Sequence, residues 1–256
     1  MKFLIRLVIF LLLLVLVLGV VALFLPASMA VGLMEGRMGA LRLEQVGGTV
    51  WNGRAERVVL RDRELGRLAW SIKPLALFSR RLDADLRLQG PELSADGFVS
   101  STGPGNLVMR GMRIGLDAQR MQPALDVPAL QLRGRVELDL DTVEVRQFFP
   151  ARIDGRAIWR DAAVTGEADA RLGELRAEFL TQPDGSIAGT VIDNGGPLQV
   201  EDGRFSLGVR GYSAEATLRA RDGDAAVQRA LQHIGVLQED GSSRFELQGR
   251  LLPVRG

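Results

Sequence analysis

The chain after residue 40 alternates between apolar and polar residues. In residues 81–88, Leu82, Ala84, Leu86 and Leu88 are separated by charged residues. A period of two places successive side chains on opposite faces of a strand, so this stretch predicts a half-buried strand. The same pattern predicts strands at residues 41–46, 49–51, 55–60, 65–70, 97–101, 106–112, 135–141, 156–159, 171–180, 186–192, 197–200, 204–209, 214–220 and 244–251. Residues rich in Gly, Pro, Asn and Asp separate these runs, so we expect a mainly antiparallel β domain over residues 41–256, as a sandwich or a rolled sheet.

Short non-strand segments interrupt this pattern. Asn52-Gly53 predicts a two-residue hairpin turn between two of the strands. Residues 73–78 predict a helical turn that begins at their proline. Residues 143–149 predict a short helix, capped by Asp141 or Thr142 and ended by the proline that follows.

A further helix is predicted at residues 224–234. Asp222 or Asp224 can cap its N-terminus, and Gly235 provides the stop. Its apolar residues fall at helical spacing: Val227, Leu231 and Ile234. We therefore expect one packed helix near the end of the β domain.

The first stretch of the chain is apolar throughout. Residues 7–25 carry no charge over about 19 residues, close to the ~20 that a membrane-spanning helix needs. Lys2 and Arg6 precede the stretch and Arg37 follows well after it, so the positive-inside rule places residues 1–6 in the cytoplasm. The expected organisation is a cytoplasmic start at 1–6, a single transmembrane helix at 7–25, a linker or amphipathic stub at 26–40 and a periplasmic domain at 41–256.

A cleaved signal peptide is the alternative interpretation of this stretch. Ser28-Met29-Ala30 resembles a weak cleavage site after a basic start. A signal core usually has about 7–15 apolar residues, and this stretch is longer. Its length therefore favours a retained anchor in the inner membrane.

Composition excludes several classes of function. The formal net charge is +1, so the chain lacks the basic excess that binds nucleic acid phosphates. It has no cysteine, so strand pairing and core packing must provide its stability. It has one histidine, which excludes a site built from several histidines.

The candidate catalytic residues are few. His233 lies in the predicted helix at 224–234, and paired acids occur on predicted strands: Asp83 with Asp85, and Asp139 with Asp141. Each pair alternates with apolar residues and has arginines nearby, which is typical of a solvated strand face. The sequence has neither a Walker loop nor a dinucleotide-binding fingerprint. We predict a protein that is not an enzyme, with no catalytic, cofactor or metal residues and no small-molecule substrate.

Trp51 and Trp70 have two interpretations. Each ends a short apolar run, which favours a place in the core of the sheet. An exposed tryptophan would instead mark a partner-binding hot spot.

The motif at residues 48–55, GTVWNGRA, after an apolar N-terminal stretch resembles the type II secretion system protein N family. Further similarity lies at residues 65–74, 82–88, 155–159, 196–198 and 224–235, with Gly241 and Gly249 beyond. The resemblance implies a non-enzymatic inner-membrane component of the machinery that exports folded proteins across the outer membrane of Gram-negative bacteria. Its partners would be other components of that system, and it transfers no catalytic or metal residues.

A different class of envelope protein also fits the pattern. AsmA-like proteins combine an N-terminal anchor with a β-rich periplasmic part and are associated with lipid handling or envelope maintenance. A rolled sheet with an apolar interior could hold acyl chains. The roughly 230 residues after the anchor are short for a groove that bridges the periplasm, which favours the secretion component.

Overall fold

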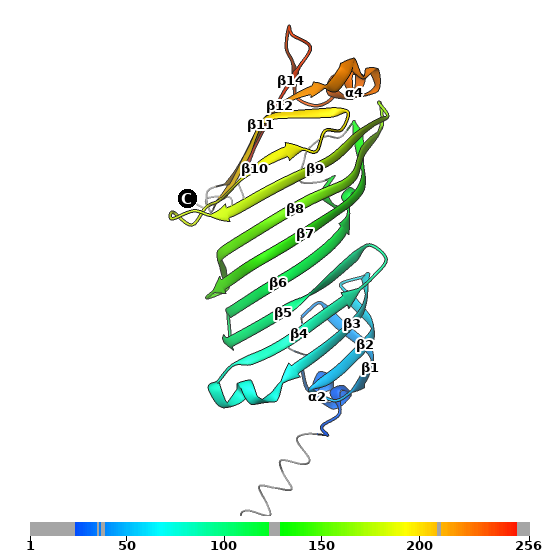
Figure 1. Cartoon of the computed structure of the whole chain (residues 1–256). Helices are drawn as coiled ribbons and strands as arrows, with labels where there is room; N and C mark the ends of the chain where they lie inside the picture. The colour runs from blue at the N-terminus through cyan, green and yellow to red at the C-terminus, as the bar shows by residue number, and fades with distance from the viewer. Residues whose placement is uncertain (1–23, 35, 37–38, 123–128, 209–210, 250–256) are drawn as a thin grey trace, which may run out of the picture. The chain divides into compact units, whose positions relative to one another are not determined.

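The computed structural model describes residues 24–34, 36, 39–122, 129–208 and 211–249 (Figure 1). Strands dominate these residues, and every strand pairing given by the hydrogen bonds is antiparallel. The chain divides into two compact units, Met1–Pro91 and Glu92–Gly256. The prediction of a mainly antiparallel β protein is therefore confirmed.

The first unit is a meander of strands with one helix beside it. It contains α2 (Ala27–Met34), β1 (Leu41–Gly48), β2 (Asn52–Leu60), β3 (Arg63–Lys73), the 3₁₀ helix η2 (Pro74–Ser79) and β4 (Leu82–Gln89), with the strands in the order β1-β2-β3-β4. The helix α2 packs against β1 and β2. The segment at 26–40, expected to be a linker or a stub, thus contains a short helix, and the turn expected at Pro74 is η2.

The apolar stretch at residues 7–25 lies, up to residue 23, outside the described residues. Within the part of the chain that the structure describes, no helix combines the length and the apolar character that a membrane span requires.

Two predictions about the first hairpin are wrong. Asn52 and Gly53 belong to β2, where Gly53 pairs with Gly48 on one side and Trp70 on the other. The turn instead lies at residues 49–51, which we expected to form a strand. Gly48 adopts a φ of +84°, a left-handed conformation that glycine adopts without strain. The chain therefore reverses at residues 49–51, before the Asn-Gly pair.

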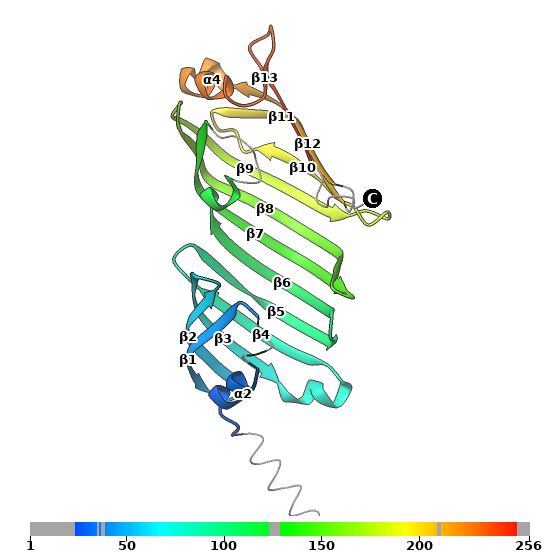
Figure 2. The same cartoon turned by 180° about the vertical axis from the view of Figure 1, so that it is seen from behind.

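The second unit is a longer meander. It contains β5 (Leu93–Gly103), β6 (Asn106–Asp117), η3 (Ala118–Met121), β7 (Leu130–Arg146), β8 (Phe149–Gly166), β9 (Ala170–Thr181), β10 (Ile187–Asp193), β11 (Leu198–Gly208), β12 (Gly211–Ala220), η4 (Arg221–Gly223), α4 (Ala225–Leu231), β13 (Val236–Leu237) and β14 (Ser243–Gly249). The strand order follows the sequence up to β12, which is followed by β14 and then β13. The run from β5 to β12 can be followed in Figure 2. Of the last predicted strand, residues 250 and 251 lie outside the described residues.

The helix predicted at residues 143–149 is wrong. These residues belong to β7 and to the start of β8, and Gln147 and Phe148 form the turn with φ values of +50° and +69°. Val143 is buried between Met109 of β6 and Ile153 of β8. Pairing with both neighbouring strands and the strand preference of valine outweigh the local capping residue and the proline that follows.

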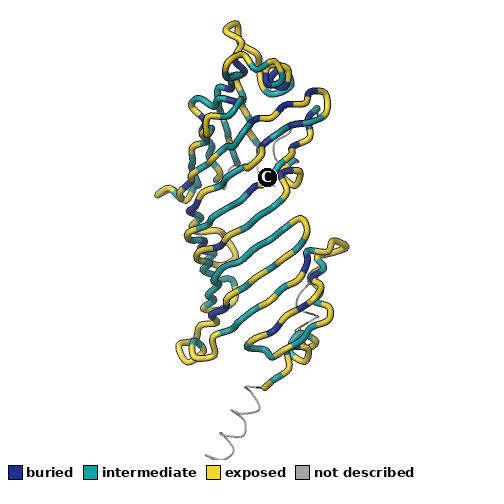
Figure 3. Tube along the Cα trace, turned by 45° about the vertical axis from the view of Figure 1, so that its right-hand side comes forward, coloured by how far each residue is buried: buried dark blue, intermediate teal, exposed yellow. Residues whose placement is uncertain are grey.

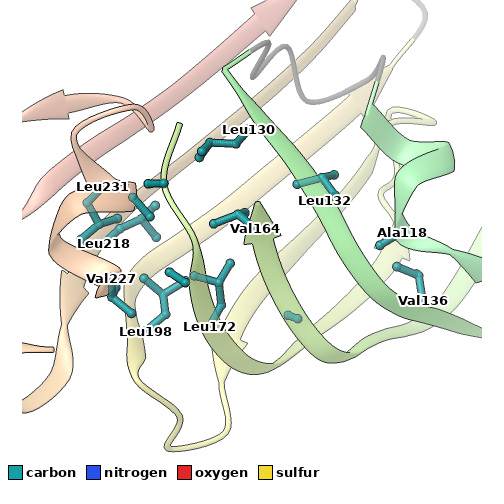
Figure 4. Close-up of a cluster of buried hydrophobic side chains, with 14 residues drawn as sticks. Ala118, Leu130, Leu132, Val136, Val164, Leu172, Leu198, Leu218, Val227 and Leu231 are labelled. Carbon is teal, nitrogen blue, oxygen red and sulfur yellow. The ribbon is translucent and has the colours of Figure 1, made fainter. Parts of the chain in front are cut away.

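The predicted C-terminal-region helix is confirmed as α4. The carboxylate of Asp224 caps it by accepting hydrogen bonds from the backbone N–H groups of Ala226 and Val227 at 2.9 and 3.0 Å. The helix packs against β9 and β12 and inserts Val227 and Leu231, which are 0% and 1% exposed, into the main buried cluster (Figure 4). Around them the cluster gathers side chains from several strands: Leu130, Leu132, Val136, Val164, Leu172, Leu198 and Leu218.

Charged residues on the other face of this sheet pair across strands. Arg160 on β8 lies 2.8 Å from Glu137 on β7 and 3.0 Å from Glu174 on β9. Arg156 lies 3.0 Å from Asp139. This face is the solvated strand face that the alternation predicts, and exposed and less exposed positions alternate along the strands in Figure 3.

Asp193 joins three segments of the second unit. Its carboxylate accepts hydrogen bonds from the backbone N–H groups of Gly195 and Val200, both at 2.9 Å, and lies 2.5 Å from a guanidinium nitrogen of Arg221. Burial acts to raise the pKa of Asp193, but these donors outweigh it, so the pKa lies below its usual value. The carboxylate is therefore a stabilising contact only in its ionised form.

We expect Asp193→Asn to destabilise the second unit in a pH-dependent way. A lowered folded-state pKa contributes stability above the unfolded value, near pH 4, and loses it as the pH falls through the folded value. The amide leaves a donor opposite another donor, which should cost about 1–3 kcal/mol at pH 7. Denaturant unfolding followed by tryptophan fluorescence, to which Trp159 contributes from the second unit, would measure this, and the difference from the unmodified chain should shrink on acidification. Asp141→Asn, at an exposed position of β7, is the control and should have little effect.

Candidate functional site: the junction at residues 48–55

The motif at residues 48–55 builds a tight connection between β1 and β2. The N–H of Thr49 donates to the carbonyl oxygen of Asn52 at 2.9 Å, and the N–H of Asn52 donates to the hydroxyl oxygen of Thr49 at 3.1 Å. A Cβ atom on Gly48 would lie 2.4 Å from the carbonyl oxygen of Asn52, so the turn requires glycine there.

The same turn holds the end of the N-terminal segment. The N–H of Val50 donates to the carbonyl oxygen of Leu25 at 2.9 Å, and Pro26 forms an isolated antiparallel bridge with Thr49. Residues 25–26 are thereby attached to the sheet by backbone contacts immediately before α2 begins. The motif therefore fixes the position at which the N-terminal segment enters the first unit.

The other side of the turn is attached to β3. The N–H of Ile72 donates to the carbonyl oxygen of Trp51 at 2.6 Å, and the hydroxyl of Ser71 donates to the side-chain oxygen of Asn52 at 2.8 Å. We call the assembly of residues 25–26, 48–55 and 70–72 the junction. It links the N-terminal segment, the first hairpin and β3 at one end of these strands.

Trp70 closes the junction. Its indole N–H donates to the carbonyl oxygen of Val50 at 2.9 Å. The ring lies over Gly53, where an added Cβ atom would come within 2.3 Å of it. Trp51 and Trp70 are both half-buried, so neither is in the fully buried core and neither is an exposed hot spot. Trp51 thus lies in the turn, Asn52 supplies a side-chain hydrogen-bond acceptor, and Gly53 leaves space for the indole ring of Trp70.

The acidic pairs singled out in the sequence do not form carboxylate pairs. Asp83 is buried at the start of β4, where η2 packs, and its carboxylate lies 3.7 Å from Arg81. Asp85 is exposed and lies 3.3 Å from the ammonium of Lys73. Asp139 binds Arg156, and Asp141 is exposed on β7. The burial of Asp83 differs from the solvated position we expected.

His233 lies in the turn that follows α4. Its Nδ1 is 3.4 Å from the carboxylate of Glu167, which is itself largely exposed. Among the residues that the structure describes, no cluster of three or more His, Cys, Asp or Glu side chains is arranged to hold a metal ion. The described side chains around His233 thus give it one acidic neighbour and no evident nucleophile to activate.

Two shallow hollows lie in the second unit. One, of about 450 Å³, lies over β10, β11 and β12 and includes Thr190, Arg204 and Glu215; Arg204 and Glu215 are 3.3 Å apart. The other, of about 350 Å³, lies beside the contact between Asp193 and Arg221 described above. Arg221 and Asp224 in the second hollow are engaged in structural contacts, as Arg204 and Glu215 are in the first.

One face of the second unit is apolar well beyond the buried cluster. Strand register aligns Ile114 with Leu138, Leu138 with Ala157, and Ala157 with Ala177. Phe179 and Phe205 continue this face and meet edge to face with ring centres 6.2 Å apart. Away from α4 and η3 most of these side chains are half-buried rather than buried, so this face is a candidate surface for an apolar ligand.

Comparisons with known proteins place these features in a family. The family model described as type II secretion system (T2SS), protein N, matches residues 39–246, a range that includes residues 48–55. The type II secretion system protein N of Vibrio cholerae serotype O1 is 26% identical over 170 residues, which are 63% of this chain and 66% of that relative. The match thus spans just under two thirds of the relative's length. No solved structure matches the chain. Because the family match covers most of the chain, the chain belongs to the type II secretion system protein N family.

Proposed function

We propose that this protein is a non-enzymatic, inner-membrane component of the type II protein secretion system. Residues 7–25 span the membrane once, residues 1–6 are cytoplasmic, and the β-rich part lies in the periplasm. The observation that carries the proposal is the junction. Backbone contacts attach residues 25–26, which lie at the end of the apolar stretch, directly to the first unit.

The protein acts by binding other components of the secretion machinery and not by chemistry. Membrane attachment confines the β units to the space beside the inner membrane and raises their effective concentration for neighbours there. The balanced charge of the chain, formally +1, is consistent with a protein partner and argues against nucleic acid. Family membership supports participation in secretion, and crosslinking in cells would identify the partner components.

A deletion strain tests this proposal. Cells that lack the gene should retain exoproteins in the periplasm, and the full chain should restore their appearance in the medium. His233→Ala and Asp83→Asn, each supplied on the same plasmid, should restore secretion to nearly the level of the unmodified chain, because no single polar group carries a reaction. If either variant accumulated normally in the membrane yet failed to restore secretion, the scaffold proposal would be wrong. An enzymatic function would then be the better explanation.

A second candidate function is lipid handling of the AsmA-like type. The observation in its favour is the half-buried apolar face of the second unit, which could hold acyl chains. A photocrosslinking residue in place of Phe205 would test it, with the same residue in place of Arg204, which points to the opposite face, as the control. Lipid adducts at position 205 alone would favour lipid handling, and adducts at neither position would leave the secretion scaffold as the better account.

A further inference from the structure

The first unit carries exposed apolar side chains at the end where the junction lies. In η2, Leu75 is 77% exposed and Phe78 is 88% exposed. In α2, Met29 and Leu33 lie one turn apart and are 59% and 81% exposed. Large apolar side chains exposed to this degree mark an interaction surface.

Strand connections show that η2 lies close to the end of the apolar stretch. Val50 binds the backbone of Leu25, and Trp51, the next residue, binds the backbone of Ile72. Two such steps across neighbouring chains amount to about 10 Å. η2 begins at Pro74, two residues after Ile72, so Leu75 and Phe78 lie at the junction end of β3. Figures 1 and 2 both show α2 and the coil of η2 at the lower end of this unit.

We propose that η2 is a second membrane contact, in which Leu75 and Phe78 insert into the interface of the same bilayer that residues 7–25 cross. This inference rests on the proposed anchoring of residues 7–25, because that anchoring brings the junction to the membrane surface. Phenylalanine and leucine are side chains that lie well at the boundary of headgroups and acyl chains, about 5–10 Å deep. Anchor and η2 together restrict the tilt of the first unit relative to the membrane.

The contact is carried by apolar side chains and not by charge. The basic residues beside η2 are Lys73, Arg80 and Arg81. Lys73 is 3.3 Å from Asp85, and Arg81 is 3.7 Å from Asp83. This leaves little net positive charge to attract anionic headgroups. We therefore expect the contact in neutral bilayers as well as in anionic ones.

Site-specific labelling of the full chain tests the inference. The chain has no cysteine, so Phe78→Cys gives one site for a fluorophore, and its exposure makes it compatible with folding. The labelled protein is placed in phosphatidylcholine nanodiscs that contain lipids with a nitroxide near the headgroup end of the chain. Loss of most of the emission is expected at position 78. Adding Leu75→Ser should reduce that loss, because one of the two inserted side chains is removed.

Two reference positions separate this inference from the anchoring proposal. Asp62→Cys lies in the turn at the opposite end of β3 and should keep its emission. Leu16→Cys lies within the proposed span and should be quenched by lipids with a deep nitroxide. If position 16 is quenched but position 78 is not, the second contact is refuted while the anchor stands. If neither is quenched, both are refuted. Quenching at position 78 only in anionic discs would show an electrostatic contact and would overturn the apolar insertion proposed here.

Discussion

Replacing Gly53 by alanine is expected to destabilise the first unit by about 2–4 kcal/mol. The added Cβ atom would lie 2.3 Å from the indole ring of Trp70 and 2.9 Å from the carbonyl oxygen of Thr49. The ring must therefore move, and its hydrogen bond to Val50 is lost with it. Crowding of a packed site costs roughly 1–3 kcal/mol, and a lost hydrogen bond adds about 1 kcal/mol.

A matched substitution isolates this effect. Gly32 lies in α2 with no heavy atom within 4 Å of its built Cβ position, so Gly32→Ala should be neutral or stabilising by up to about 1 kcal/mol. Calorimetric unfolding of the full chain in detergent would compare the two variants. Trp70→Leu combined with Gly53→Ala should cost less than the sum of the single changes, because the smaller side chain relieves the clash. A Gly53→Ala variant as stable as Gly32→Ala would show that the ring does not require glycine beneath it.

The strands were largely predictable because their signal is local. In residues 81–88 the alternation alone predicts that Leu86 and Leu88 lie on the same face of the strand. In the structure Leu86 pairs with Trp70 and Leu88 with Leu68. The helix α4 was equally accessible, since its capping aspartate and apolar spacing are both local features. Where residues close together in the sequence determine the local structure, the sequence alone predicts it.

The errors arise where distant pairing decides the structure. Residues 143–149 follow a possible cap and precede a proline, but two neighbouring strands offer hydrogen bonds along residues 143–146, and the chain reverses at Gln147 and Phe148. At the first hairpin, the Asn-Gly pair is a common turn signal, but Gly53 is required as space for Trp70, 17 residues further on. These requirements appear only when the positions of the distant paired residues are known.

The junction was only partly visible in the sequence. The sequence gives the motif at residues 48–55 a family resemblance and gives Asn52-Gly53 the role of a hairpin turn, whereas in the structure both residues belong to β2 and hold the junction. Nor did the sequence show that Leu75 and Phe78 would stand exposed, since apolar residues in a short turn usually face a core. Basic residues on both sides of that turn, at Lys73 and at Arg80, were the available signal of an exposed position.

Releasing the chain from the membrane is expected to reduce secretion. A chain released into the periplasm keeps its folded units but loses confinement beside the membrane. Tethering of this kind can raise apparent affinity by about 100-fold or more without any new contact. Release should therefore reduce secretion strongly, although the junction, the buried cluster and every strand remain.

Secretion by living cells shows whether the apolar stretch acts as a membrane tether for a secretion component. In the deletion strain, exoprotein in the medium is measured with two variants of equal abundance. In one, a leucine segment of the same length replaces residues 7–23. In the other, a cleavable signal peptide replaces residues 1–23, which frees the rest of the chain and keeps Leu25 of the junction. We expect the leucine variant to restore secretion and the released variant to fail. Full secretion with the released variant would show that the membrane tether is not required.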